Sequence, residues 1–149
     1  MATTWILVAE NSNARILKAS SRIGPLEEYD HLEHSRGRLH ERQLNSDHPG
    51  RSFDSVGQAR HALEATVNPK QQELIGFVEQ VANYLDQAFN RGEFGQLIII
   101  AGPAFLGLLR KKLSNRAVAA VVMQMDRNLG HHTVEEIRRH LPDHLPVLT

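Results

Sequence analysis

The sequence predicts a single α/β domain over residues 1–149, in which a mixed sheet of about five strands is flanked by three helices. Two strand-like runs, at 4–9 and 14–19, are separated by turn residues and predict a β-hairpin. Apolar residues then recur at helical spacing from 69 to 91, and the rest of the chain alternates between strands and helices. A hairpin or meander followed by this alternation favours parallel strands joined by crossover helices.

Composition limits the class of protein. The 149 residues are enough for one domain with a substantial core. Lys plus Arg equals Asp plus Glu, 17 each, so no global field attracts nucleic acid or membrane. The absence of cysteine excludes disulfides and thiolate zinc sites. Because we find neither a signal peptide nor a membrane-spanning run, we expect a cytoplasmic location.

The first third of the chain predicts three strands. Thr4–Ala9 is a continuous apolar run of the kind that is covered on both faces of a sheet. Asn11-Ser12-Asn13 has turn chemistry, and Ala14–Ala19 resumes as the second strand. After a turn that ends at Pro25, the charged segment 26–34 predicts a third strand at an edge of the sheet.

The longest helix is predicted between Asn68-Pro69, which has the Asn and Pro of a helix start, and Gly92, the expected stop. Its apolar residues recur at intervals of three and four, which indicates one buried face. They are Leu74, Val78, Val81, Ala82, Leu85 and Phe89.

Two more strands and two more helices are predicted in the second half. Gln96–Ala101 and Val118–Met125 are uncharged and read as buried strands. Between them a helix follows Gly102-Pro103, and a final helix opens at the capping box of Thr133 and Glu136. In such sheets, ligands bind at the carboxyl ends of the parallel strands.

That edge would carry Gly102 and the segment from Asp126 to His132. If the first strand is parallel to these, Glu10-Asn11 joins them. Asp126 ends a buried strand, so it is a candidate general base or metal ligand, or simply a cap of a helix or turn.

Residues 35–68 lack regular periodicity and predict a long functional loop. Between His34 and His61 it has five arginines and three acidic residues. Pro49-Gly50-Arg51-Ser52 has the parts of an anion site, since glycine lets backbone N–H groups converge and the guanidinium grips phosphate. The alternative is an ordered turn in which Arg51 pairs with a nearby aspartate. The predicted binding residues are Asp47, Gly50, Arg51, Ser52, Asp54, Ser55, Gly57, Arg60 and His61, with Arg110 from a helix.

Several classes of site are not favoured. The loop has no Gly-Lys-Ser/Thr after its glycine, so it is not a nucleotide-hydrolysing P-loop. No Gly-x-Ser-x-Gly nucleophile motif exists. The histidines from 34 to 61 are irregularly spaced, and the adjacent His131 and His132 diverge in regular structure. We therefore expect no metal site and no cofactor.

The motif Asp47-His48-Pro49-Gly50-Arg51-Ser52-Phe53-Asp54-Ser55, with Gly57 and Arg60-His61 after it, resembles the signature of the bacterial host attachment protein family. The resemblance extends to Trp5–Ala9, to Gly24-Pro25-Leu26, to Pro103–Arg110, and to Asp126 with His131 ahead of Glu135-Glu136-Ile137, and so covers nearly the whole chain. It implies a proposed role in attachment to host cells.

The family is also similar to the middle domain of archaeal and eukaryotic class I release factors and of Pelota, an α/β fold with Gly-Gly-Gln before a long helix. Here Val56-Gly57-Gln58 occupies that place. The resemblance implies a release-factor-like fold and a link to translation. Val56 resists the backbone conformation that the first glycine adopts, which disfavours peptidyl-tRNA hydrolysis.

Three functions remain open. The leading hypothesis is a cytoplasmic binding module whose loop contacts phosphate groups of RNA or the ribosome, with Arg51, Arg60 and Arg110 as anion contacts. The second is a hydrolase of a phosphoester or peptidyl-tRNA ester, in which Gln58, Asp126 or His131 positions water. The third is a protein-interaction factor that affects attachment to host cells. The sequence leaves the oligomeric state undetermined.

Overall fold

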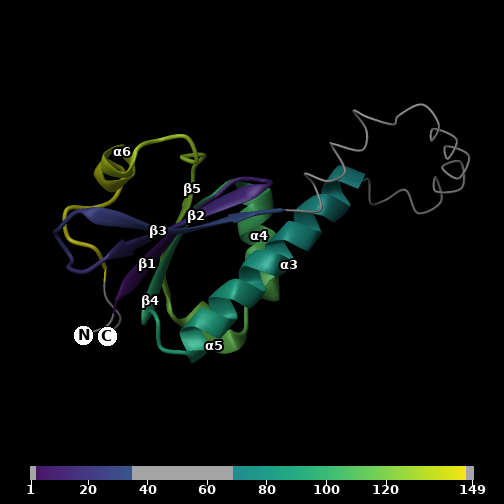
Figure 1. The fold of residues 1–149 in the computed structure, drawn as a ribbon, viewed down its shortest axis with the longest axis horizontal. Helices are drawn as coiled ribbons and strands as arrows, with labels where there is room; N and C mark the ends of the chain where they lie inside the picture. The colour runs from purple at the N-terminus through teal and green to yellow at the C-terminus, as the bar shows by residue number, and fades with distance from the viewer. Residues whose placement is uncertain (1–2, 35–68, 147–149) are drawn as a thin grey trace, which may run out of the picture.

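The computed structural model describes residues 3–34 and 69–146, which form one mixed five-stranded sheet with helices on both faces (Figure 1). The order of the strands is β3-β2-β1-β4-β5. The strands are β1 Thr4–Ala9, β2 Asn13–Ala19, β3 Leu26–Glu33, β4 Gln96–Ala101 and β5 Val121–Asp126. The helices of the described residues are α3 Pro69–Asn90, α4 Pro103–Lys112, α5 Asn115–Ala119 and α6 Val134–Arg139.

The predicted N-terminal meander is confirmed. β1 pairs antiparallel with β2, and the turn is closed by the backbone N–H of Glu10, which donates to the carbonyl of Asn13 at 2.8 Å. β2 pairs antiparallel with β3, which is an edge strand as expected. The register shifts within β3, so that Tyr29 has no partner between Glu28 and Asp30. Such a bulge increases the local twist of an edge strand.

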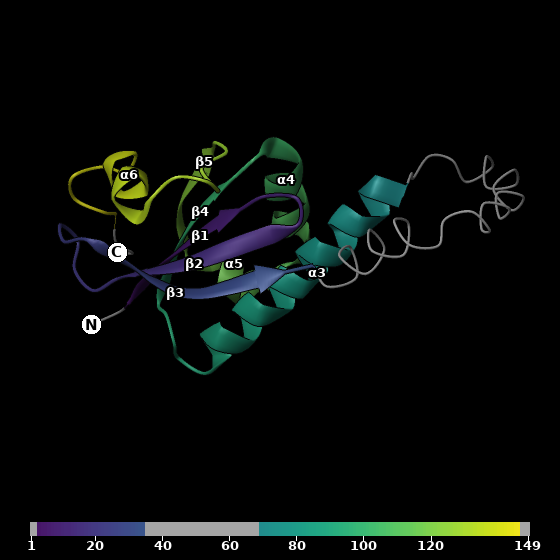
Figure 2. The same ribbon diagram turned by 45° about the horizontal axis from the view of Figure 1, so that its top comes forward.

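The parallel half of the sheet is also as predicted, because β1 pairs parallel with β4 and β4 pairs parallel with β5. Figures 1 and 2 show α3 and α4 on one face and α6 on the other. β1 therefore faces two cores: Trp5 and Leu7 pack on the α3 side, and Ile6 and Val8 on the α6 side. This explains why β1 and β4 are continuous apolar runs.

Helix α3 begins at Pro69 and ends one residue before the predicted Arg91. Gly92 has φ 78°, the left-handed conformation that makes glycine the usual residue after a helix. Val78, Val81 and Leu85 are buried as expected, and the predicted face also contains the buried Phe77. The packing of this long face against β1 and β4 fixes the helix across the sheet.

The start of the last strand was predicted wrongly. Residues 115–119 form helix α5, so that β5 begins at Val121 instead of Val118, and the described part has four helices instead of three. The cause is local, because the Ser114 side chain accepts a hydrogen bond from the Ala117 N–H at 3.1 Å and caps the short helix. The final helix has the predicted capping box of Thr133 and Glu136.

The single tryptophan lies at the centre of an aromatic cluster. The centroid of the Trp5 ring is 5.3 Å from that of Tyr29, 6.0 Å from that of Tyr84 and 4.7 Å from that of Phe94. The Tyr84 hydroxyl donates a hydrogen bond to Asp30. Burial, and then this carboxylate, raise the pKa of Tyr84 well above its ordinary value. The cluster joins β1, β3, α3 and the segment before β4.

Candidate functional site

The carboxyl ends of the three parallel strands lie at one edge of the sheet, as the sequence predicted. Val8 is paired with Ile100, and Ala101 with Asp126, so β1, β4 and β5 end side by side. The residues at these ends are Glu10, Gly102 and Asp126. Because β1 is parallel to β4, the conditional prediction that Glu10 joins this edge is confirmed.

Glu10 and His131 meet at this edge. The Oε2 atom of Glu10 lies 3.5 Å from Nε2 of His131, and their side chains are 18% and 89% exposed. The Oε2 atom itself is buried and accepts no hydrogen bond. The imidazole of His131 is therefore the polar group that lies next to this oxygen. With a protonated imidazole, the contact would be an ion pair.

The contact requires a glycine at position 130. A Cβ atom built on Gly130 would lie 2.0 Å from Oε2 and 2.4 Å from Cδ of Glu10, well inside van der Waals contact. The backbone of the loop between β5 and α6 thus packs directly on the Glu10 carboxyl group. This close approach sets the position of the next residue, His131.

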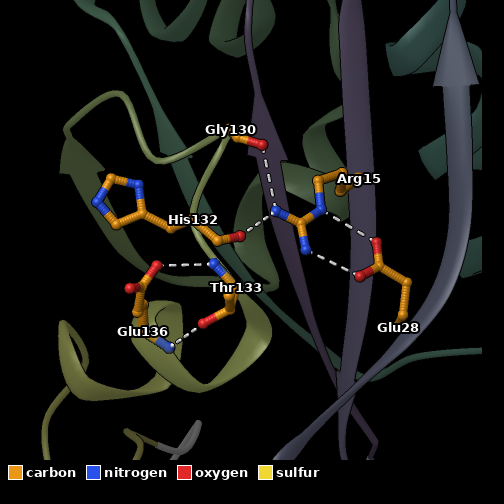
Figure 3. Close-up of polar contacts among 6 residues, drawn as sticks. All are labelled: Arg15, Glu28, Gly130, His132, Thr133 and Glu136. Carbon is orange, nitrogen blue, oxygen red and sulfur yellow. Dashed lines mark hydrogen bonds and ion pairs between the residues drawn. The ribbon is translucent and has the colours of Figure 1, made fainter.

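Arg15 of β2 joins this loop to the sheet (Figure 3). Its guanidinium donates to the carbonyls of Gly130 and His132, at 3.2 and 2.7 Å, and to both carboxylate oxygens of Glu28, at 3.0 and 2.8 Å. The hydrogen bonds to Glu28 raise the pKa of Arg15, and those from Arg15 lower the pKa of Glu28. Arg15 is a positioning residue, because it holds the loop through backbone carbonyls.

The loop leads directly into α6. Figure 3 shows the capping box, in which the Thr133 side chain accepts from the Glu136 N–H at 3.1 Å and the Glu136 carboxylate accepts from the Thr133 N–H at 2.9 Å. The hydrogen bond from the Thr133 backbone lowers the pKa of Glu136. The backbone on both sides of His131 is therefore held, by Arg15 at Gly130 and His132 and by the helix cap at Thr133.

The structure separates two of the predicted site residues from this contact. The register pairs Asp126 with Ala101, which belongs to the core on the α3 side, whereas Glu10 and His131 lie towards α6. Within residues 3–34 and 69–146, no hydrogen bond or ion pair joins Asp126 to His131. Arg110 is exposed on α4, on the α3 side of the sheet.

The remaining predicted site residues lie outside the described part of the chain. These are Asp47, Gly50, Arg51, Ser52, Asp54, Ser55, Gly57, Gln58, Arg60 and His61. Among the residues that the structure does describe, no group of three or more His, Asp or Glu side chains could hold a metal ion. In that same part, no helix has the length and apolar character needed to cross a bilayer.

A cationic surface lies on α4 and α5. From Gln96 to Met125 the chain has four cationic side chains and no carboxylate. Lys112 pairs with Glu79 of α3 at 2.9 Å, and Arg116 lies over the Phe89 ring and donates to Asn90. Arg110 and Lys111 are exposed and have no partner among the described residues. The four cations are Arg110, Lys111, Lys112 and Arg116.

The edge of the sheet formed by β3, at the other end of the strand order from β5, is acidic. Strand β3 has four carboxylates within eight residues, and they are exposed. They are Glu27, Glu28, Asp30 and Glu33. A chain of neutral formal charge thus has a basic region on α4 and α5 and an acidic region on β3. Sequence reasoning noted an excess of arginine between His34 and His61 and named Arg110 as an anion contact, but it identified neither the rest of this cationic surface nor the role of Arg15. Arg15 is one of two cationic residues in β2, with Lys18, and nothing in the pattern distinguishes it.

Comparisons with known proteins give one family. The sequence profile described as "Protein required for attachment to host cells" matches residues 5–141. No curated protein matches the sequence. A solved structure of the Aquifex aeolicus Ppx/GppA phosphatase, the type II variant, is similar with a TM-score of 0.43 and 12% sequence identity. The similarity covers 84% of this chain but only 35% of the phosphatase chain.

Proposed function

Because the chain belongs to the family of proteins required for attachment to host cells, we propose a function for it within that family: a cytoplasmic module that binds the phosphate groups of RNA. The observation that supports this proposal is the charge of residues 96–125, four cations without a carboxylate. Exposed cations that have no partner among the described residues are available to bind phosphate. Arginine contacts phosphate through two parallel hydrogen bonds.

The contacts proposed are Arg110 and Lys111 on α4, with Arg116 beside them. Arg51 and Arg60, which lie outside the described residues, are proposed as further contacts because their loop combines arginine with glycine and serine. The acidic β3 edge repels a polyanion, so RNA is expected to approach from the α4 side. Contact with ribosomes would follow from the same affinity for RNA.

The test is the binding of a single-stranded RNA by fluorescence anisotropy over a range of salt concentrations. Wild-type protein is expected to bind, and Arg110→Ala with Lys111→Ala to reduce the slope of log affinity against log salt by about 1.4, which is two phosphate contacts on a single strand. Arg127→Ala with Arg139→Ala, which removes the same charge from elsewhere, should leave the slope nearly unchanged.

Failure of the wild-type protein to bind RNA at low salt would refute the proposal, as would equal losses in the two double variants. A partner that is captured from a lysate and withstands both nuclease and high salt would instead favour the protein-interaction function. The nuclease and salt treatment separates RNA binding from protein interaction, because phosphate contacts are lost at high salt and packed protein interfaces are not.

A hydrolase is the second candidate, and the contact of Glu10 with His131 favours it. A carboxylate that orients an exposed imidazole is a common arrangement for a general base. Turnover of a phosphoester or peptidyl-tRNA ester should then be lost in His131→Ala and in Glu10→Gln, but retained in His144→Ala, which removes an exposed histidine elsewhere. Equal turnover in all three variants would exclude this use of His131.

A further inference from the structure

Strand β5 is an open edge of the sheet. Its neighbour is β4 alone, and no backbone hydrogen bond joins residues 121–126 to any other described segment. β4 is fully buried, whereas each residue of β5 is partly or fully exposed. No described segment uses the outward N–H and C=O groups of β5, so these groups are available to pair with another strand.

The two edges of the sheet differ in how they are protected. β3 has four carboxylates, and charged side chains oppose the addition of another strand to an edge. An irregular register occurs in both edge strands, at Tyr29 of β3 and at Val122 of β5, and does not distinguish them. β5 has neither charge nor proline from Val121 to Met125, and its sole ionisable residue is Asp126 at the end. This edge has the chemistry of a strand that pairs rather than one that is protected.

The sequence of β5 is also complementary to itself. In a symmetric antiparallel pair the two-fold axis is perpendicular to the sheet, so one residue faces its own copy. With Gln124 at the axis, its amide faces a second amide, and each amide offers both a donor and an acceptor. Met123 then faces Met125 of the second copy, an apolar pair on the α6 side.

The charges agree with the same register. Asp126 lies two residues beyond the Gln124 axis, so the two Asp126 carboxylates are not opposite each other. We propose that the protein forms a homodimer in which β5 pairs antiparallel with β5 of a second copy around Gln124. Both five-stranded sheets then continue as one, and the helices of the two copies lie on matching faces.

Sedimentation equilibrium of the full chain without RNA tests this proposal independently of the proposed function. Wild-type protein is expected to show a concentration-dependent dimer. Gln124→Glu places two carboxylates face to face and should yield a monomer, whereas Gln124→Ala should retain the dimer. Because Gln124 is exposed, both substitutions are expected to leave the fold intact, which circular dichroism checks. A wild-type monomer at every concentration, or a dimer that Gln124→Glu does not weaken, would overturn the proposal.

Cross-linking checks the register directly. The sequence has no cysteine, so Gln124→Cys supplies a single thiol. Facing residues of an antiparallel pair have Cα atoms about 4.5 to 5.5 Å apart, within the range that a disulfide spans. Mild oxidation should therefore convert Gln124→Cys to a covalent dimer, and Glu27→Cys, on the β3 edge, should remain monomeric. The opposite result, or equal cross-linking, would refute the register.

Discussion

At the scale of single residues, the position of His131 depends on a glycine and a carboxylate that the chain brings together from far apart. Glu10 follows β1, and Gly130 lies in the loop before α6. The Oε2 atom of Glu10 is buried against that loop without a hydrogen bond, which costs stability, and a functional role would explain why the cost is tolerated. The proposed role is to orient His131, whose Nε2 atom lies 3.5 Å from this oxygen.

Gly130→Ala tests this packing. A Cβ atom at 2.0 Å from Oε2 must displace the Glu10 carboxylate or the loop, so the free energy of unfolding is expected to fall by about 1 to 3 kcal/mol, the usual cost of overpacking. Denaturant unfolding measures the change. The double variant Glu10→Ala, Gly130→Ala removes the obstacle and should recover part of the loss. Additive losses in the double variant would contradict the contact.

At the scale of elements, Arg15 connects β2, β3 and the loop before α6 through one guanidinium. The sequence predicted the elements well where apolar runs are continuous: β1 and β4 have the predicted bounds. It failed at the start of β5, because the first residues of the predicted strand 118–125 belong to the short helix α5, which the cap of Ser114 initiates.

The candidate site was predicted in part, for a similar reason. The topology placed Glu10 and His131 at one edge, but the face on which each residue lies depends on register. A register shift between Leu97 and Ile98 sets the face of Asp126, and no sequence pattern indicates it. The hold of Arg15 on the loop was not predicted, because its partners there are the backbone carbonyls of Gly130 and His132, and every residue offers such a group.

The pair of Arg15 and Glu28 predicts a dependence of stability on pH. Because the pKa of Glu28 is lowered in the folded chain, its contribution is present at neutral pH and is lost as the pH falls below its ordinary value of 4.5 and through the lowered one. Glu28→Gln should therefore lower stability at neutral pH and have a smaller effect in acid. Urea midpoints at both pH values measure this difference.

Glu27→Gln is the matched control, since Glu27 is the exposed neighbour of Glu28 and its side chain has no partner among the described residues. It should change the midpoint little at either pH. An effect of Glu28→Gln that is the same at neutral and acid pH would show that the Arg15 contact does not depend on the charge of Glu28.

At the scale of the whole molecule, the separation of basic and acidic regions affects the approach of a polyanion more than the neutral net charge does. The basic region on α4 and α5 and the acidic β3 lie at different sides of the sheet, so the chain presents different potentials to a polyanion. Glu79 lowers the positive charge of the basic region, because its carboxylate pairs with Lys112 at 2.9 Å. An exposed pair of this kind is worth little to stability.

Glu79→Gln is therefore expected to strengthen RNA binding. The freed Lys112 adds one phosphate contact, which should steepen the salt slope by about 0.7 on single-stranded RNA. Glu27→Gln makes the same change in net charge on β3 and should have a smaller effect. Anisotropy titrations of both variants decide this point, and an equal gain in the two would indicate that only net charge matters.

The aromatic cluster around Trp5 gives the protein a fluorescence reporter of its own. This indole is the sole one in the sequence, it is 1% exposed, and its neighbours come from β3, α3 and the segment before β4. Separation of any of these from the sheet changes the surroundings of the same chromophore. Emission from wild-type protein, without an attached dye, should therefore follow the opening of either the meander or the long helix.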